Sequence, residues 1–276
     1  MKVAYCGYDF FADCFESLAE NRNIEVMKLY TFKTDDVYNF NKKILDIANK
    51  YNIPFTLEKI SGNDVEELVK MGCECIIAAA YPYKIPIKQN RGINIHPTLL
   101  PIGRGPWPLP RVILSEQEKS GVTIHKLTDE LDSGDVLIQK SFVLNEKEDL
   151  ETLSCRSQML AQNLIETIFQ DQKSFEYYWK NAYPQGEGEY WSYPSDLEMT
   201  FNGNMTVAEI DKIVRAYGKF DSCVEFEGRT WLVWDVNVWK EEHTYEPGTI
   251  VHKTNKEYLM AAKDGFVCLR FFKEDV

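Results

Sequence analysis

The sequence predicts an α/β fold, with a Rossmann-like, mostly parallel sheet covered by helices on both faces and a small, β-rich, barrel-like domain at the C-terminus. Three observations predict it. Strand-like and helix-like periods alternate from residue 2 to residue 96, a long helical period fills 149–170, and short strand-like runs dominate after residue 220. The length of 276 residues allows one large domain with a smaller one attached.

The first part of the chain supplies the alternating elements. Apolar runs predict strands at 2–7, 24–32, 74–80, 92–96, 120–127 and 134–144. Amphipathic runs predict helices at 10–20, 38–51, 64–72 and 149–170. Gly7 follows the first predicted strand, but the further glycines of a dinucleotide-binding fingerprint are missing, so we interpret it as a tight turn.

The chain changes character after about residue 176. Residues 177–204 are rich in Gly, Pro and aromatic side chains, which predicts an ordered linker rather than a flexible one. Thr206 and Glu209 form a capping-box pattern ahead of an apolar helical stripe. Short strands are then expected at 223–228, 230–239, 248–253, 257–262 and 266–272. We therefore expect a first domain at 1–180, a linker at 181–203 and a β-rich domain at 204–276.

Composition places the chain among ordinary globular proteins. Hydrophobic residues make up 44% and charged residues 27% of it, without a low-complexity tract, so we expect no disorder. The formal net charge of -12 repels phosphate backbones. We therefore expect no generic binding to nucleic acid.

The seven cysteines are odd in number, scattered and mostly set among apolar residues, which is typical of reduced thiols in a core. Cys73 and Cys75 form the only close pair, and no second pair or nearby histidine completes a zinc site, so we expect no metal. The first residues lack the pattern of a signal peptide, and no apolar run reaches membrane-spanning length. We expect a cytoplasmic protein without membrane contact.

Polar side chains mark the ends of two predicted strands. Asn94 and His96 are two positions apart, so they point to the same face at the carboxyl end of their strand, where open α/β sheets bind ligands. Asp132 stands on a turn after the strand that carries His125, and a carboxylate there can orient a histidine. Taken singly, each has a plainer interpretation: His125 as a satisfied core histidine, and Asp132 as a residue that only stabilises its turn.

Together these residues resemble the folate-dependent formyltransferases, which include methionyl-tRNA formyltransferase and the nucleotide-sugar N-formyltransferases. The resemblance rests on "NIHPTLLPIGRG" and "GVTIHKLTDELDSGDVL", and it extends to "MKVAYCGYDFFADCFESL", "IPFTLEKI" and "CIIAAAYPYKIP". It is strong over residues 1–144 and looser after residue 189, where the linker, "IVRAY" and "EPGTIVHK" look like the family's smaller C-terminal domain.

The resemblance implies roles for particular residues. Asn94, His96 and Asp132 take the three catalytic positions: Asn94 and a protonated His96 would stabilise the formyl oxyanion, and Asp132 would raise the affinity of His96 for a proton. The formyl donor would be 10-formyltetrahydrofolate, without a metal. Residues implied to enclose the donor are Tyr81, Pro82, Tyr83, Lys84, Ile85, Leu131, Ser133 and Gly134. Residues implied to bind the acceptor are Thr98, Leu99, Arg104, Gly105 and Trp107.

One departure from the family's pattern leaves the acceptor open. Where members often have a small residue or tyrosine before the Arg-Gly pair, this chain has Ile102 and Gly103, and a bulky Pro-Trp-Pro at 106–108 follows. We expect an N-formyltransferase acting on the primary amine of a nucleotide-linked amino sugar, because no basic footprint for RNA is visible. Methionyl-tRNA formyl transfer is the alternative. A non-catalytic folate- or nucleotide-binding module and formyl-folate hydrolysis are further alternatives.

The C-terminal domain carries many apolar and aromatic residues for its size. Such a surface is typical of a domain that packs against another domain or another subunit. We therefore expect a homodimer.

Overall fold

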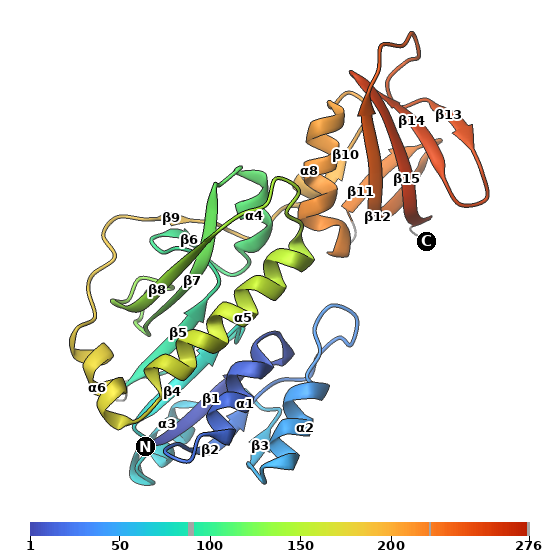
Figure 1. Ribbon diagram of the computed structural model, residues 1–276. Coiled ribbons are helices and arrows are strands. Elements are labelled where there is room, and N and C mark those ends of the chain that lie inside the picture. Colours follow the sequence, from blue (N-terminus) through green and yellow to red (C-terminus); the bar gives the residue numbers. More distant parts are fainter. Residues whose placement is uncertain (88–90, 221, 275–276) are drawn as a thin grey trace. The chain divides into compact units, whose positions relative to one another are not determined.

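The computed structural model describes residues 1–87, 91–220 and 222–274, and the chain divides into two compact units (Figure 1). The first unit holds 1–108, 119–143 and 154–191, and the second holds 109–118, 144–153 and 192–276. The chain thus enters the second unit three times. The two units are defined by contacts between residues, and each combines segments that are distant in the sequence. The domain boundaries expected from the sequence therefore stay predictions.

A seven-stranded sheet forms the centre of the first unit (Figure 1). Its order is β3 (Phe55–Thr56), β2 (Glu25–Tyr30), β1 (Lys2–Gly7), β4 (Cys75–Ala79), β5 (Gly92–His96), β7 (Lys119–Lys126) and β8 (Val136–Val143). The strands from β3 to β5 pair in parallel, whereas β7 pairs antiparallel with both β5 and β8. The expectation of a mostly parallel sheet is therefore confirmed.

Helices cover both faces of this sheet because successive side chains of its strands point to opposite sides. On β1, Val3 and Tyr5 join one apolar cluster, and Ala4 and Cys6 join another. The first cluster includes side chains of α1 (Ala12–Glu20), α2 (Lys42–Lys50), α5 (Leu150–Ile168) and α6 (Gln172–Lys180). The second includes side chains of α3 (Gly62–Lys70). A 3-10 turn, η1 (Asp9–Phe11), leads into α1.

The second unit is a six-stranded, mostly antiparallel sheet with short helices. Its strand order is β10 (Thr200–Phe201), β11 (Ser222–Phe226), β12 (Arg229–Lys240), β15 (Gly265–Glu274), β14 (Tyr258–Ala262) and β13 (Ile250–Lys253). Its helices are α4 (Leu109–Leu114), α7 (Asp196–Met199), α8 (Val207–Tyr217) and the 3-10 turn η2 (Gly218–Phe220). Val207, Ile210 and Val214 on α8 enter the apolar cluster of this sheet. The β-rich C-terminal part of the predicted fold is confirmed.

Two short strands connect distant parts of the first unit. β6 (Ile102–Arg104) lies in the loop after β5, and β9 (Glu189–Tyr190) lies in the segment predicted to be a linker. They pair in parallel as a separate two-stranded sheet. The segment at 189–191 is therefore part of the first unit and contacts the loop that follows Asn94 and His96.

In the part of the chain that the structure describes, no helix is both long and apolar enough to cross a membrane. Within the same residues, no group of three or more His, Cys, Asp and Glu side chains is arranged to hold a metal ion.

The capping box that begins α8 gives a direct test of local stability. The Thr206 hydroxyl accepts a hydrogen bond from the Glu209 amide at 3.3 Å, and a Glu209 carboxylate oxygen accepts from the Thr206 amide at 2.7 Å. We expect Thr206→Ala to lower the free energy of unfolding by about 1 kcal/mol, whereas Thr206→Ser keeps the hydroxyl and most of the stability. Urea unfolding followed by circular dichroism measures both. Equal midpoints for Thr206→Ala and the wild type would contradict a role for the cap.

Candidate functional site

The end of β5 presents the first two predicted catalytic residues. Asn94 and His96 point to the same face, and the antiparallel pairing with β7 places Asn94 directly opposite His125 and His96 opposite Thr123. The site therefore lies where the parallel part of the sheet meets its antiparallel part. This pairing brings a second histidine to the predicted catalytic residues.

Asp132 completes the predicted set. Its backbone has a φ of 53°, in the left-handed region that Asp and Asn tolerate better than other residues with side chains. One carboxylate oxygen, Oδ1, accepts a hydrogen bond from Asn94 Nδ2 at 3.0 Å, and the other, Oδ2, accepts one from the Gly105 amide at 3.0 Å. The structure thus brings together Asn94, His96 and Asp132, which are up to 38 residues apart.

His96 is buried, with 4% of its surface exposed. Its Nε2 donates a hydrogen bond to the Gly103 carbonyl at 2.7 Å, and its Nδ1 lies 3.6 Å from Asp132 Oδ2. Because a carbonyl can only accept, Nε2 keeps its proton in the neutral ring. Nδ1 is therefore the ring atom at which His96 gains or loses a proton.

His125 is held in a complementary way. Its Nδ1 donates to the Lys126 carbonyl at 2.9 Å, which leaves Nε2 bare in the neutral ring. Nε2 lies 3.2 Å from Asn94 Nδ2 and 3.4 Å from Asp132 Oδ1. The Asn94 amide group thus faces the carboxylate with one hydrogen and the imidazole with the other.

Burial and charge act against each other on the two ionisable groups. For Asp132, burial raises the pKa, but the charges of His96 and His125 and the hydrogen bonds from His125 and Gly105 outweigh it and lower the pKa to about 2. For His96, burial is the largest effect and lowers the pKa, and the nearby Asp132 offsets it only in part. Asp132 thus acts in the expected direction by raising the affinity of His96 for a proton, while burial lowers the pKa of His96 overall. A buried imidazole loses more hydration than one carboxylate at 3.6 Å restores.

The loop after β5 contains the residues implied to bind the acceptor, and several are engaged within the protein. The Thr98 hydroxyl is buried and donates to the Ile102 carbonyl at 2.9 Å. Arg104 donates from Nε and Nη2 to Gln185 Oε1 at 3.2 and 3.0 Å, and from Nη2 to the Gly186 carbonyl at 3.0 Å. Leu99 and Trp107 are partly buried.

Gly105 combines an unusual backbone conformation with a close contact. It has a φ of 125°, and a Cβ there would lie 2.0 Å from the Trp191 carbonyl oxygen. No other residue fits this conformation and this contact. Its amide is the donor that holds Asp132, so the structure places it beside the predicted catalytic carboxylate.

The residues implied to enclose the formyl donor form two segments. Residues 81–85 follow β4, and 131–134 form the turn of Asp132. Lys84 Nζ lies 3.1 Å from both the carboxylate and the carbonyl oxygen of Asp129, two residues before the second segment. Pro82 and Lys84 are exposed and Ile85 is buried.

The two segments also leave apolar surface uncovered. Tyr83 is 39% and Leu131 is 54% exposed, and the Tyr81 and Tyr83 rings lie edge to face at 5.4 Å. The Ser133 hydroxyl lies 2.9 Å from that of Thr128, and a Cβ on Gly134 would lie 1.9 Å from the Lys126 carbonyl oxygen. These features fit a flat heteroaromatic group that is bound by apolar side chains and backbone atoms.

Sequence reasoning missed the part played by residues 183–191. Gln185 Nε2 donates to the carbonyls of Asp132 at 2.9 Å and of Gly134 at 2.6 Å. The Trp191 amide donates to the Arg104 carbonyl at 2.6 Å, and the Trp191 ring is buried. The only signal in the sequence is the Gly- and aromatic-rich composition of the segment, which predicts order but no partner.

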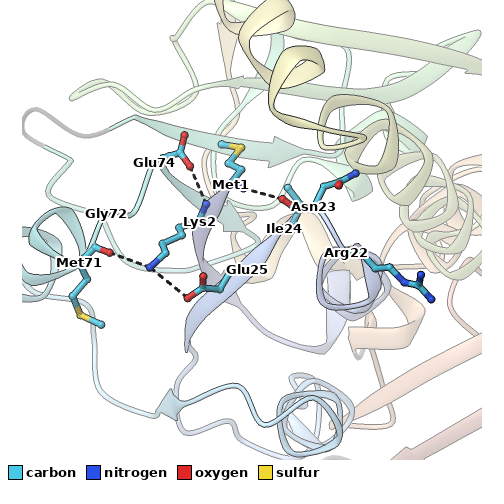
Figure 2. A pocket seen from close by; sticks show the side chains of 9 residues that line it. All are labelled: Met1, Lys2, Arg22, Asn23, Ile24, Glu25, Met71, Gly72 and Glu74. Atoms are coloured by element: carbon cyan, nitrogen blue, oxygen red, sulfur yellow. Dashed lines mark hydrogen bonds and ion pairs between the residues drawn. The ribbon is translucent and has the colours of Figure 1, made fainter.

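An open hollow of about 570 Å³ lies at the opposite edge of the sheet, where β1 and β2 begin (Figure 2). Lys2 Nζ lies 3.7 Å from Glu25 and donates to the Met71 carbonyl, and Glu74 accepts from the Lys2 amide (Figure 2). It contains none of the predicted site residues. We therefore place the candidate functional site at the end of β5.

Comparisons with known proteins agree over both parts of the chain. Residues 39–168 match the family model described as formyl transferase, and residues 194–274 match the model of the formyl transferase C-terminal domain. The methionyl-tRNA formyltransferase of Coxiella burnetii (strain CbuK_Q154) is 26% identical over 98% of this chain and 89% of its own length. The methionyl-tRNA formyltransferase of Ehrlichia canis (strain Jake) is 32% identical over a stretch that makes up 60% of this chain and 59% of that relative.

Solved structures show the same fold at lower identity. The N-formyltransferase from Helicobacter canadensis, in complex with folinic acid and dTDP-3-aminofucose, has a TM-score of 0.71 and 16% identity over 99% of both chains. A variant of HypX from Aquifex aeolicus has a TM-score of 0.72 and 17% identity over all of this chain, which spans 46% of HypX.

The lowered pKa of Asp132 predicts how stability depends on pH. Because the folded-state pKa of about 2 lies below the ordinary value of 3.8, the carboxylate stabilises the fold fully above about pH 4, and this stabilisation is lost as the pH falls toward 2. The shift corresponds to about 2 kcal/mol. Asn tolerates the same backbone conformation, so the stability difference between wild type and Asp132→Asn should shrink by about that amount on acidification. Urea unfolding at several pH values measures it, and a difference that does not change with pH would contradict the assignment.

Proposed function

The chain belongs to the formyl transferase family, and we propose that it is an N-formyltransferase that transfers a formyl group from 10-formyltetrahydrofolate to a primary amine. The observation that carries the proposal is the meeting of Asn94, His96 and Asp132 at the end of β5 through the hydrogen bonds described above. A hydrogen-bond donor, a titratable ring and a carboxylate are the groups that such a transfer needs.

In the proposed reaction, the acceptor nitrogen forms a bond to the formyl carbon, the bond from that carbon to the donor nitrogen breaks, and one proton passes from the amine to the leaving nitrogen. The Asn94 amide hydrogen that faces His125 in this structure turns toward the formyl oxygen and donates to it. This hydrogen bond stabilises the negative charge on that oxygen. Neutral His96 takes up the proton at Nδ1, and Asp132 stabilises the resulting imidazolium before His96 releases the proton.

The residues at 81–85 and 131–134 are the proposed site of the donor. The exposed Tyr83 and Leu131 side chains would cover its apolar ring faces, and backbone groups of both segments would pair with its ring nitrogens and oxygen. Lys84 would keep the segments together through Asp129. When bound, the donor supplies the formyl group.

We propose a nucleotide-linked amino sugar as the acceptor, as in the Helicobacter canadensis complex, with methionyl-tRNA as the second candidate because the curated relatives carry that name. Charge favours the sugar. Arg104 is held by Gln185, and Arg111 pairs with Glu198 at 2.6 Å.

Several cations of the second unit are also paired with carboxylates. These pairs are Arg229–Glu274, Lys253–Glu227, Arg270–Asp235, Lys240–Asp264 and Lys147–Asp211. A surface in which carboxylates accompany the cations attracts a phosphate backbone weakly. A nucleotide sugar needs only a few cations for its diphosphate, together with an apolar face for its base or sugar.

Replacement of the three site residues tests the reaction. We expect Asn94→Ala, His96→Ala and Asp132→Ala each to lower kcat by at least about a hundredfold, because each removes a group that acts in the transition state. The losses should be far from additive. The exposed His252 on β13 supplies a matched control, and His252→Ala should keep wild-type turnover. Near wild-type kcat in His96→Ala would show that the assignment is wrong.

The acceptor is tested by incubating the enzyme and 10-formyltetrahydrofolate with dTDP-, UDP- and GDP-linked amino sugars, with charged initiator tRNA, and without an amine. Mass spectrometry then follows the product. We expect one class of sugar to gain a formyl group. Modification of the tRNA with every sugar inert would favour the second candidate. Release of free formate without any amine would indicate a hydrolase, and donor binding without turnover would indicate a non-catalytic binding module.

A further inference from the structure

Residues 183–191, here called the strap, cross the candidate site in the first unit. Resting on the proposed function, we infer that Gln185 of the strap is a positioning residue for formyl transfer, which holds the turn of Asp132 against the loop of Arg104 and Gly105. Gln185 touches neither ring nitrogen of His96 nor the Asp132 carboxylate, so it acts through the backbone.

On one side, the strap is bound to the turn that carries Asp132. Tyr183 and Val136 exchange two backbone hydrogen bonds of 2.8 and 3.0 Å. Gln185 Nε2 then donates to the carbonyls of Asp132 and Gly134. The Asp132 backbone is in a conformation that side-chain-bearing residues seldom adopt, and such a conformation persists only where surrounding contacts hold it.

On the other side, the strap is bound to β6 and its neighbours. The Glu189 amide donates to the Pro101 carbonyl at 3.1 Å, and the Trp191 amide donates to the Arg104 carbonyl at 2.6 Å. The Gln185 Oε1 atom accepts from Nε and Nη2 of Arg104. The Gln185 amide therefore donates to the turn through Nε2 and accepts from the loop through Oε1.

The two sides carry the groups that surround His96 and Asp132. The loop supplies the Gly103 carbonyl, which accepts from His96 Nε2, and the Gly105 amide, which donates to Asp132 Oδ2. A Cβ on Gly103 would lie 2.8 Å from the Trp191 ring, so the ring backs this stretch of the loop. If the turn moves relative to the loop, the Asp132 carboxylate moves away from Gly105 and from the imidazole together.

This arrangement explains why the amide of glutamine suits position 185. Glutamate would place a carboxylate against the Asp132 and Gly134 carbonyls, and a side chain without polar atoms would leave Arg104 and both carbonyls without these partners. Only an amide of this length supplies the donor and the acceptor at the same time.

The kinetic test compares two variants with a control on the strap. Gln185→Met keeps the length of the side chain, Gln185→Glu keeps the acceptor but not the donor, and Glu187→Gln changes an exposed residue of the same strap. We expect both Gln185 variants to lower kcat between about tenfold and a hundredfold while KM for donor and acceptor stays within about twofold, and the control to be unchanged. Wild-type kcat in either folded Gln185 variant would overturn the inference.

A second readout needs no turnover. The titration of His96 followed by NMR reports its contacts with Asp132, with His125 and with the Gly103 carbonyl, which are the groups that face it. We expect Gln185→Met to move the midpoint by about half a pH unit or more, and Glu187→Gln to leave it in place. A moved midpoint in a protein that formylates no amine would refute the proposed function alone. An unmoved midpoint with an unchanged kcat would refute the positioning role alone.

Discussion

The candidate site depends on one constraint: a buried carboxylate must be supplied with donors, because it loses its hydration without gaining a permanently charged partner. Asp132 is 5% exposed, and Lys and Arg side chains do not contact it in the described part of the chain. Its oxygens instead accept hydrogen bonds from an asparagine amide and a backbone amide, and two histidine rings lie within 3.6 Å of them. These groups come from three segments, so satisfying this one carboxylate fixes the mutual positions of β5, β7 and the loop that contains β6.

His96 and His125 present different ring nitrogens to the site. His96 is bound through Nε2 to a carbonyl and keeps Nδ1 toward the carboxylate, whereas His125 is bound through Nδ1 and turns Nε2 toward Asn94. The tautomers are thus set by backbone carbonyls, which can only accept. A neutral His96 beside an ionised Asp132 is able to accept a proton and to stabilise the positive charge that results.

Much of the fold was predictable because it follows from local periods. The strands at 2–7 and 92–96, the helix at 149–170 and the capping box at Thr206 all agree with the structure within a few residues. The antiparallel pairing of β5 with β7 was not predicted, because strand direction depends on contacts between distant segments and leaves no periodic signal.

Of the site residues, only those with a characteristic chemistry could be predicted from the sequence. Asn94, His96 and Asp132 stand out through their spacing and their place at strand ends, whereas Gln185 stands in a segment without periodicity and takes its partners only once the chain is folded. The pKa of His96 could not be predicted for a related reason, because a sequence shows the neighbouring charge but not the extent of burial.

The order in which these segments leave the ribosome has its own consequence. Asn94, His96 and Asp132 are synthesised well before residue 185, and a domain can fold as it emerges. A nascent chain that ends before the strap would hold every residue of the triad but lack the amide that connects its turn to its loop. Assembly of the reactive geometry would then wait for residues 183–191, which follow α5 and α6, so that a translation product truncated before them would carry Asn94, His96 and Asp132 without the amide that positions them.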